Sequence, residues 1–264
     1  MIVSAVQADV RGMALFMKGM VIPMKKALVD LHTHTIASGH AFSTLKENLE
    51  EAREVGLAVL GLSDHAMSVP GAANKLYFQN LKLLPERIGG IRLLHGVEVN
   101  IMDYEGTLDM DETLLKEMDY VIASLHVICV KPGTREENTE AILGALENPG
   151  VKIIGHPDDG RYPLDVERVV KRAQEKQAVL ELNNSSLRTG SHRQNSRENS
   201  REILECARKY NVPILMGSDS HICYHVGKFE QAEELLSEVG FPPELVLNYH
   251  PEKLDIVMNQ GHKL

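Results

Sequence analysis

The residues Val29-Asp30-Leu31-His32-Thr33-His34-Thr35-Ile36-Ala37-Ser38-Gly39-His40 run from a short apolar strand into a loop that carries three histidines. His32 and His34 are two positions apart, so extended backbone points both imidazoles to the same side. Imidazole is the commonest metal ligand among protein side chains near neutral pH. Such a pair also occurs hydrated on protein surfaces, so the spacing alone is a weak filter. Its recurrence elsewhere in the chain therefore decides its meaning.

The same succession, an apolar run followed by a residue that can bind a metal, recurs along the whole chain. Apolar strands are expected at 27–31, 58–62, 91–100, 120–125, 151–155, 178–182 and 212–217. They alternate with helical patterns, which argues for parallel βαβ units. Their nearly continuous apolar character is typical of strands that are buried on both faces.

Helix signals lie between these strands. Two capping boxes, Thr44 with Glu47 and Thr134 with Glu137, predict helices that begin at these residues. Gly56 is expected to end the first helix, and Asp165 to cap a later one. Helices are expected over 45–55, 76–88, 111–118, 134–147, 165–177, 200–210, 229–239 and 251–260, with a weak strand at 246–247.

The distribution of polar residues distinguishes between two architectures for such a chain. An open doubly wound sheet gathers its ligands at one switch point, so only one or two strand ends would carry the chemistry. Here six of the seven strand ends carry residues that can bind a metal. Only a closed ring of strands brings six carboxyl ends to one centre, which is where βα barrels place their sites. The sequence therefore predicts an α/β barrel.

Composition sets limits on the class of protein. The 264 residues are 43% hydrophobic and carry 28 basic against 37 acidic side chains, a formal net charge of -9. This mildly acidic balance does not favour a nucleic-acid or membrane-surface partner. Cys129, Cys206 and Cys223 form no C-x-x-C motif, which argues against a disulfide framework and fits a reducing cytoplasm. The sequence contains no run of 18 or more uncharged apolar residues, so no membrane span is predicted.

The first 24 residues are expected to lie outside the barrel, which is predicted over residues 25–264. They are apolar and rich in methionine, but Asp9, Arg11 and Lys18 interrupt them. A signal peptide begins with positive charge and continues with a clean apolar run, so this segment fits that class poorly. A disordered or loosely docked extension is expected instead, with Met20 and Met24 as alternative starts.

Seven histidines, one glutamate and one aspartate are the candidate ligands at the strand ends. Nine nitrogen and oxygen donors exceed what one tetrahedral ion needs, so the set predicts two or three ions. It suits zinc, with manganese or iron as alternatives, better than magnesium or calcium, which prefer oxygen shells. The nine residues are His32, His34, His40, His65, Glu98, His126, His156, Asp219 and His221.

Residues near these ligands receive separate interpretations. Glu98 lies in an apolar strand, where an unpaired carboxylate is costly, so it needs a cation and is expected to bridge two metals. Asp64 is expected to orient His65 rather than to bind metal. His95 is expected to be structural, because its odd offset from Glu98 turns it to the other face of the strand.

A polar loop after the strand at 178–182 supplies the candidates for substrate contact. Asn184, Arg188 and Arg193 could meet an anion at the mouth of the site, although arginines in such loops are usually solvated. The other histidines, His192, His225, His250 and His262, are expected to be solvated.

The chain resembles the PHP (polymerase and histidinol phosphatase) superfamily in motifs that occur in the same order. They are Asp-Leu-His-Thr-His at 30–34, Ser-Asp-His at 63–65, Gly-Val-Glu at 96–98, His126, Gly-His-Pro-Asp at 155–158 and Gly-Ser-Asp-Ser-His at 217–221. The likeness runs from about residue 27 to the end of the chain and is nearest to the small stand-alone PHP phosphatases with a trinuclear site. It implies a distorted (βα)7 barrel.

The resemblance also implies how the ligands are shared among three ions. By position, one ion would be held by His32, His34, Glu98 and Asp219, a second by His40, His65 and His221, and a third by His126 and His156, with Glu98 bridging. Every ligand position is filled, which implies an active member. The N-terminal extension has no counterpart in the family.

Three classes of function follow from these observations. The first is a phosphatase that hydrolyses a small phosphomonoester by attack of a metal-bound hydroxide, since clustered ions lower the pKa of bound water and stabilise the leaving oxygen. The second is another hydrolase on the same scaffold, such as a phosphodiesterase, an exonuclease or an amide hydrolase. The third is a non-catalytic metal-binding module. The lack of a basic stripe weighs against a nuclease, and the resemblance is compatible with self-association.

Overall fold

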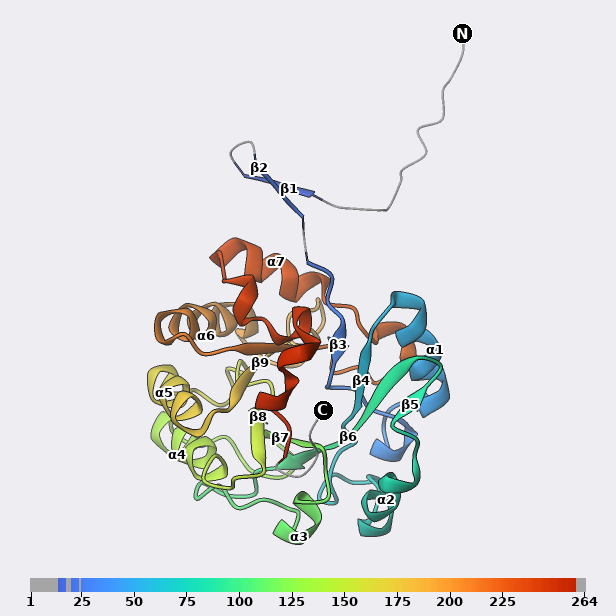
Figure 1. Cartoon of the computed structure of the whole chain (residues 1–264). Coiled ribbons are helices and arrows are strands. Elements are labelled where there is room, and N and C mark those ends of the chain that lie inside the picture. Colours follow the sequence, from blue (N-terminus) through green and yellow to red (C-terminus); the bar gives the residue numbers. More distant parts are fainter. Residues whose placement is uncertain (1–13, 18–19, 24, 260–264) are drawn as a thin grey trace.

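Seven parallel strands form the centre of the protein in the computed structural model, which describes residues 14–17, 20–23 and 25–259 (Figure 1). Each strand pairs with the next in the order β3, β4, β6, β7, β8, β9, β10. Their bounds are β3 Val29–Asp30, β4 Val59–Leu62, β6 Ile91–Asn100, β7 Tyr120–Ser124, β8 Val151–Ile154, β9 Val179–Asn183 and β10 Ile214–Gly217.

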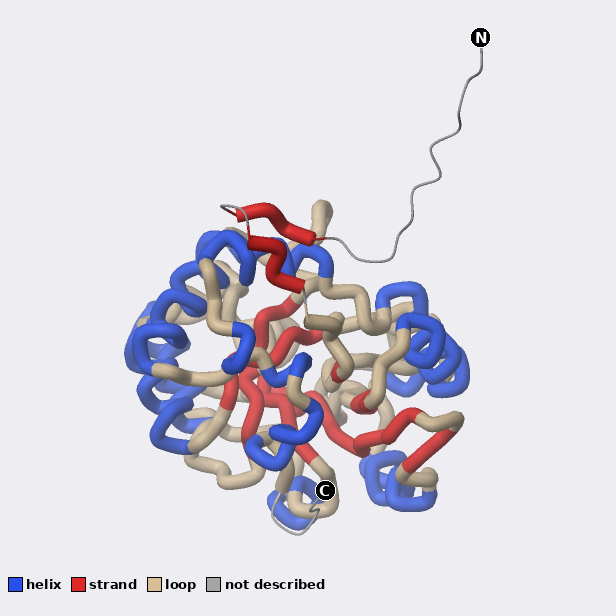
Figure 2. Tube along the Cα trace, turned by 45° about the horizontal axis from the view of Figure 1, so that its top comes forward, coloured by secondary structure: helices blue, strands red, loops and turns tan. Residues whose placement is uncertain are grey.

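The sheet curves until its first and last strands meet. Thr33, just beyond β3, forms a parallel bridge with Ser220, just beyond β10. The N–H of His34 donates to the carbonyl of Ser220 at 2.9 Å. Helices lie around the strands in both views of the chain (Figures 1 and 2). The predicted distorted (βα)7 barrel is therefore confirmed, and the open sheet is excluded.

The helices begin and end where local signals place them. Thr44 and Thr134 both form complete capping boxes, and Gly56 ends α1 with a φ of 76°. The side chain of Asp165 accepts from the N–H of Arg168 and caps α5. The helices are α1 Leu45–Val55, α2 Lys75–Asn80, α3 Glu112–Leu115, α4 Arg135–Ala145, α5 Val166–Lys176, α6 Ser196–Tyr210 and α7 Glu230–Val239.

The helix predicted over 76–88 is wrong in its second half. After α2 the chain forms the 3-10 helix η2, Leu81–Leu83, and then the strand β5, Arg87–Ile88, which pairs antiparallel with β6. Pro85 lacks the N–H that a continuing helix would need. Gly89 and Gly90, both at positive φ, form the two-residue turn of a β-hairpin.

The C-terminal segment forms 3-10 turns rather than the predicted α-helix and strand. The 3-10 helices of this segment are η4 Pro243–Leu245, η5 Leu247–Tyr249 and η6 Pro251–Ile256. Two others, η1 Ile36–Ser38 and η3 Cys223–His225, lie in the loops after β3 and β10. Val246 contributes only an isolated bridge to Ile214. The side chains of Leu254, Val257 and Met258 pack into one cluster with residues of the strands, so burial rather than helical periodicity positions this segment.

Tyr120 fills the interior of the barrel and connects opposite strands. It is fully buried, and its hydroxyl donates to the carbonyl of Leu31 at 2.6 Å. A Cβ atom at Gly61 would lie 2.2 Å from this hydroxyl, and one at Gly96 would lie 2.3 Å from the ring. The two glycines therefore leave the space in which the tyrosine lies, directly before the ligand pair at His32 and His34.

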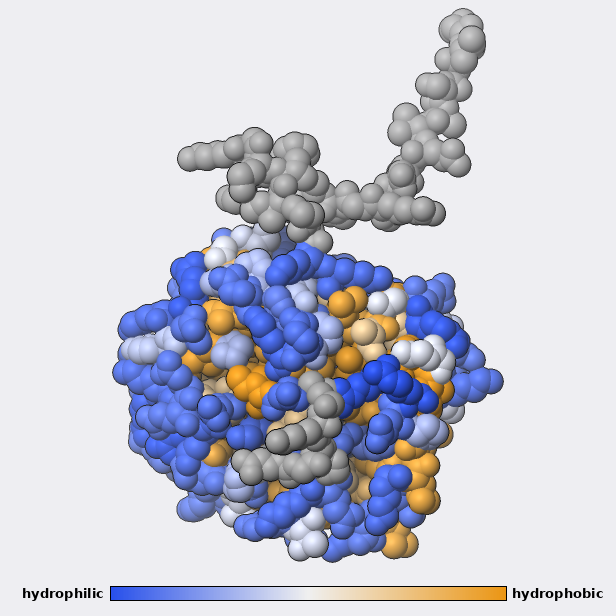
Figure 3. Space-filling model, viewed as in Figure 1, coloured by the Kyte–Doolittle hydropathy of each residue, from blue (hydrophilic) through white to orange (hydrophobic). Residues whose placement is uncertain are grey.

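Hydrophilic residues cover most of the surface over α4, α5 and α6 on the face seen in Figure 3. No helix of the described chain is long and apolar enough to cross a lipid bilayer. The strands β1, Ala14–Met17, and β2, Met20–Pro23, pair with each other antiparallel. The structure does not describe residues 1–13, 18–19, 24 and 260–264, a set that includes His262. That residues 1–24 form a disordered or loosely docked extension stays a prediction.

Candidate metal centre

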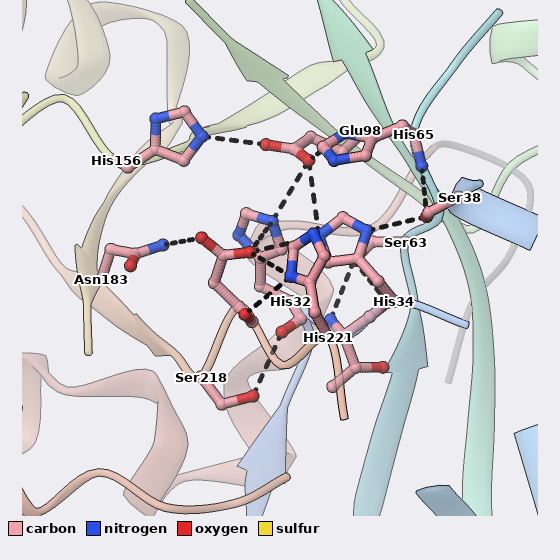
Figure 4. A network of polar contacts seen from close by, with 12 residues as sticks. His32, His34, Ser38, Ser63, His65, Glu98, His156, Asn183, Ser218 and His221 are labelled. Carbon is pink, nitrogen blue, oxygen red and sulfur yellow. Dashed lines mark hydrogen bonds and ion pairs between the residues drawn. The ribbon is translucent and has the colours of Figure 1, made fainter. Parts of the chain in front are cut away.

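All nine predicted ligands converge at the carboxyl ends of the barrel strands, and we call them the metal centre. Glu98, fully buried on β6, lies in the middle (Figure 4). Its Oε2 atom is 2.7 Å from Nδ1 of His65, 3.4 Å from Nε2 of His32 and 3.5 Å from Nε2 of His34. Its Oε1 atom is 3.0 Å from Nε2 of His156 and 3.4 Å from Nε2 of His126.

Asp219 occupies the opposite side of the histidine pair. Its Oδ1 atom lies 3.3 Å from Nε2 of His34, 3.7 Å from Nε2 of His32 and 3.5 Å from Nδ1 of His221. The Nε2 atom of His221 is in turn 2.9 Å from Nε2 of His40. Every candidate ligand thus has a donor atom within 4 Å of a donor atom of another.

Three subsets of the metal centre have the compactness of an ion site. In each, one donor atom from every member lies within 4.8 Å of the others. The subsets are His32, His34 and Asp219; His34, His65 and His221; and His65, Glu98 and His126. His34 and His65 each belong to two subsets, so the three groups are contiguous and form one cluster of residues rather than three separate ones.

Buried polar atoms without partners test whether this cluster fits metal ions. Nε2 of His32, Nε2 of His34, Nδ1 of His65 and Oε2 of Glu98 are all buried and have no hydrogen-bond partner among the described residues. Leaving one such atom unsatisfied costs about 1–3 kcal/mol, and more for a charged group. These four atoms lie close together, and each can donate an electron pair to a metal ion. Divalent transition ions satisfy such a set, so the residues fit the group.

Neighbouring side chains fix which nitrogen of each imidazole faces the centre. Nδ1 of His32 lies 2.6 Å from Oε1 of Glu181, a carboxylate that can only accept, so this nitrogen carries the proton. Nε2 of His32 is then the nitrogen that faces the centre. Nδ1 of His126 donates in the same way to the amide oxygen of Asn100 at 2.7 Å. Such outer partners orient metal-binding histidines and raise their basicity.

A chain of three residues orients His34. The hydroxyl of Ser38 donates to Oδ1 of Asp64 at 2.6 Å, so its oxygen accepts from Nδ1 of His34 at 3.0 Å. The same oxygen accepts from the N–H of His65 at 3.1 Å. Nε2 of His34 is therefore left as the metal-facing nitrogen.

The predicted role of Asp64 is corrected by these contacts. Its carboxylate accepts from the N–H and hydroxyl of Thr35, from Ser38 and from the hydroxyl of Tyr77. It therefore holds the loop after β3 and does not bond the imidazole of His65. The adjacency of the two residues in sequence was misleading, because neighbouring side chains on extended backbone point to opposite sides.

Electrostatics keep the carboxylates of the centre ionised. Burial raises the pKa of Glu98, but His32, His65 and His126 outweigh it and hold the pKa well below its ordinary value. The pKa of Asp219 is likewise well below the ordinary value, since His32 and Arg193 outweigh burial. Burial, together with His221 and His65, lowers the pKa of His34, which keeps this imidazole neutral. Anionic carboxylates and a neutral imidazole are the forms that bind metals.

Two candidate ligands have backbone conformations that non-glycine residues rarely adopt. His156 has a φ of 30° and Asp219 a φ of 49°. A left-handed conformation costs about 1–2 kcal/mol at a non-glycine residue, and such strain clusters at functional sites. At His156 the N–H donates to Oε2 of Glu181 at 2.7 Å, which offsets part of this cost. Both side chains contact the centre, His156 through Oε1 of Glu98 and Asp219 through Nε2 of His34.

Several residues of this site were not among the predicted ones. Glu181 lies in the apolar strand β9 and is 2% exposed, so the argument made for Glu98 applied to it equally. It contacts His32 and the backbone of His156. Ser38 and Asn100 gave no comparable signal, because their partners lie 26 or more residues away or depend on the loop conformation.

The three residues predicted to contact the substrate lie at different distances from the centre, and only the guanidinium of Arg193 contacts a residue of it. The guanidinium of Arg193 reaches the centre, where it binds Oδ2 of Asp219 at 3.0 Å. Arg188 is half-buried, and burial lowers the pKa of its guanidinium, while the nearby carboxylates of Glu230 and Asp219 act in the opposite direction. The structure does not bring Asn184 to the centre, because its amide is fully buried between Gln231 and the N–H of Ala232 at the start of α7.

A cavity of about 370 Å³ opens beside the metal centre. Its lining includes His40, His65 and His126 of the centre, together with Arg161, His192 and Arg193. Clefts of 300–1,000 Å³ are typical of small-molecule sites. Arg161 was also missed by the sequence analysis. It lies two residues after Asp159 and binds that carboxylate through Nε and Nη2.

Known proteins resemble this chain along most of its length. A protein from Clostridium novyi (strain NT) described as a "probable phosphatase" is 48% identical over 239 residues, which cover 90% of this chain and 97% of that protein. A "probable phosphatase" from Acetivibrio thermocellus is 47% identical, covering 87% and 94%. One from Thermoanaerobacter sp. (strain X514) is 49% identical, covering 84% and 91%.

A solved structure shares the fold at much lower sequence identity. It is the histidinol phosphate phosphatase of Lactococcus lactis complexed with zinc, L-histidinol and phosphate, with a TM-score of 0.58 and 19% identity over 82% of this chain and 95% of that one. The family model for the PHP domain matches residues 30–240, from the strand before His32 to the end of α7. On this match and these relatives, the chain belongs to the PHP domain family.

Proposed function

We propose that the protein is a metal-dependent phosphatase that hydrolyses small phosphomonoesters. The observation that carries this proposal is a set of four buried nitrogen and oxygen atoms that lie close to one another, without hydrogen-bond partners, beside a cavity. The names of the relatives and the fold of the histidinol phosphate phosphatase support the reaction class. The nitrogen-rich donor set favours two or three transition-metal ions, with zinc ahead of manganese and iron.

The chain's own residues have distinct parts in this proposal. Bound divalent ions supply Lewis acidity toward phosphoryl oxygens and lower the pKa of coordinated water. Glu98 stays anionic in the middle of the cluster and joins the histidines on both sides. His32 and His34, oriented by Glu181 and Ser38, keep their Nε2 lone pairs toward the ions. Arg193 binds Asp219 and stands at the cavity side, where an anionic substrate would enter.

Charge and size support a small substrate rather than a polymer. The net charge of -9 gives nucleic acid no general attraction. The cavity is at the lower end of the range of small-molecule sites. All three cysteines are free, in keeping with a protein that works in a reducing compartment such as the cytoplasm.

The test is activity on matched monoesters and diesters after metal removal and reconstitution with Zn, Mn or Fe. We expect monoester hydrolysis that requires the ions and falls by at least 100-fold in His65→Ala. The matched control, His250→Ala, removes a histidine outside the centre that contacts Glu252 and Lys25, and it should retain full activity. Preferential diester cleavage would support the diesterase alternative, and no cleavage at full metal loading would support the binding-module alternative.

A further inference from the structure

Exposed apolar side chains gather around the mouth of the metal centre. Seven large hydrophobic residues of the described chain are exposed. Five of them lie within three residues of a candidate ligand histidine, and they are Ile36, Phe42, Val127, Ile128 and Tyr224. Scattered exposed hydrophobic residues need no explanation, but a cluster around a concave site indicates a binding surface.

Five of the residues that line the same cavity as His40, His65 and His126 are apolar. Val69 and Pro70 come from the loop after β4, and Leu125, Val127 and Ile128 come from the segment after β7. We call these five residues the apolar wall. Val69 and Leu125 are 8% exposed and form its base, whereas Val127 and Ile128 are 46% and 60% exposed and form its rim. Because the same cavity reaches His65 and His126, a ligand bound to the ions would also lie against this wall.

The basic side of the cavity has little free charge to offer. The guanidinium of Arg161 is bound to Asp159, and that of Arg193 is bound to Asp219. His192 is kept neutral, because burial and the nearby Arg193 and Arg161 lower its pKa. A second anionic group on a substrate would have to break one of these pairs. The cavity therefore favours one phosphoryl group and an uncharged remainder.

We propose, on the basis of the function proposed above, that the preferred substrates are phosphomonoesters of uncharged, largely apolar alcohols or phenols of about the size of one ring. The phosphoryl group faces the metal centre, and the leaving group packs on the apolar wall. An added methylene in such a pocket changes specificity by roughly 10–200-fold, so the wall is sufficient to discriminate between substrates.

Three phosphomonoesters with different leaving groups test this assignment. Benzyl phosphate has an apolar leaving group, glycerol 1-phosphate has a polar uncharged one of similar basicity, and phosphoglycolate has an anionic one. We expect kcat/KM to be highest for benzyl phosphate, by at least 10-fold over glycerol 1-phosphate, and lowest for phosphoglycolate. Equal values for the three esters, or a preference for phosphoglycolate, would overturn the proposal and leave the phosphatase function intact.

A pair of matched variants assigns the preference to the wall. Ile128→Asn should reduce the ratio of kcat/KM for benzyl phosphate to that for glycerol 1-phosphate by about 10-fold. Leu83→Asn is the control, because Leu83 is 76% exposed and does not line the cavity. It should leave the ratio unchanged. Both residues are exposed, so neither substitution threatens the fold. An unchanged ratio in Ile128→Asn contradicts the proposal.

Binding without turnover separates this proposal from the reaction itself. Calorimetry with benzylphosphonate and methylphosphonate on metal-loaded protein should give a more negative heat-capacity change for the benzyl compound, since it buries apolar surface. The difference should shrink in Ile128→Asn and persist in Leu83→Asn. If benzylphosphonate binds no more tightly than methylphosphonate, the apolar leaving-group site is excluded even for an inactive protein.

Discussion

Oε1 of Glu181 lies 2.6 Å from Nδ1 of His32, and this pair depends on the absence of a side chain at Gly217. A Cβ atom there would lie 1.7 Å from Oε1 of Glu181 and 3.0 Å from Cβ of His32. Three strands, β3, β9 and β10, therefore contribute jointly to the orientation of one imidazole. The order of these strands around the barrel makes the contact, since β9 pairs with β10 and β10 closes on the chain after β3.

Glu181→Gln should weaken metal binding by roughly 10- to 100-fold, the usual cost of losing a partner of a metal-binding histidine. The carboxylate accepts from His32, His156 and Asn183, and a glutamine has one acceptor oxygen for them. Competition with a chromophoric chelator measures the affinity. Glu140→Gln, which alters an exposed pair with Arg168, is the control and should bind as the wild type does. Equal affinities would show that Glu181 does not tune His32.

Gly217→Ala should destabilise the protein by about 1–3 kcal/mol or more, because the new methyl group overlaps Glu181 and His32. The cost should be smaller when Glu181→Ala is already present, since that change removes the closer of the two contacts. Urea denaturation of the four proteins in this cycle gives the coupling energy. Strict additivity of the two substitutions would contradict the steric account.

Ser38→Ala should lower both stability and metal affinity. It removes the acceptor of His34 Nδ1 and of the His65 N–H, together with a donor to Asp64. Leaving such groups unpaired costs about 1–3 kcal/mol. Thermal unfolding with and without added zinc separates the two effects. Ser237→Ala on the exposed side of α7 is the reference and should change neither quantity.

Tyr120→Phe should cost about 1–3 kcal/mol of stability, because the fully buried hydroxyl donates to the carbonyl of Leu31 and that acceptor would be left unpaired. Chemical denaturation measures the loss. Tyr224→Phe, at a tyrosine that is 70% exposed, should unfold at the wild-type midpoint. If Tyr120→Phe left the free energy of unfolding unchanged, the barrel interior would have to relax around the missing hydrogen bond.

Metal removal should lower the melting temperature, because the ions satisfy buried donor atoms that have no other described partner. An ion at a free concentration 100-fold above its Kd stabilises the folded state by about 2.7 kcal/mol. For a chain of this size that corresponds to roughly 5–10 °C. Scanning calorimetry of chelated and zinc-loaded protein measures the shift. If both samples unfolded at the same temperature and neither contained bound zinc, the conclusion that these residues bind metal ions would be contradicted.

Much of the fold could be predicted from local signals. The capping boxes at Thr44 and Thr134 define helix starts by contacts that span three residues, so the sequence contains both partners. The candidate ligands could be predicted for a related reason, since residues that can bind a metal occur at six of the seven strand ends, and only a ring of strands brings these ends together. The helix predicted through Ile88 is wrong because Pro85 and the Gly89-Gly90 turn outweigh the apolar periodicity in this segment.

By itself the sequence determined the seven barrel strands, the capping boxes and the nine candidate ligands, because these depend on residue type and short-range spacing. Only the tertiary structure decided which partner each polar group obtains: Glu181 for His32, Ser38 for His34, and Gln231 rather than a substrate for Asn184. The physical reason is that a buried polar atom must find a partner nearby in space. Closure of the barrel, through Thr33 and Ser220, selects which distant residues are near.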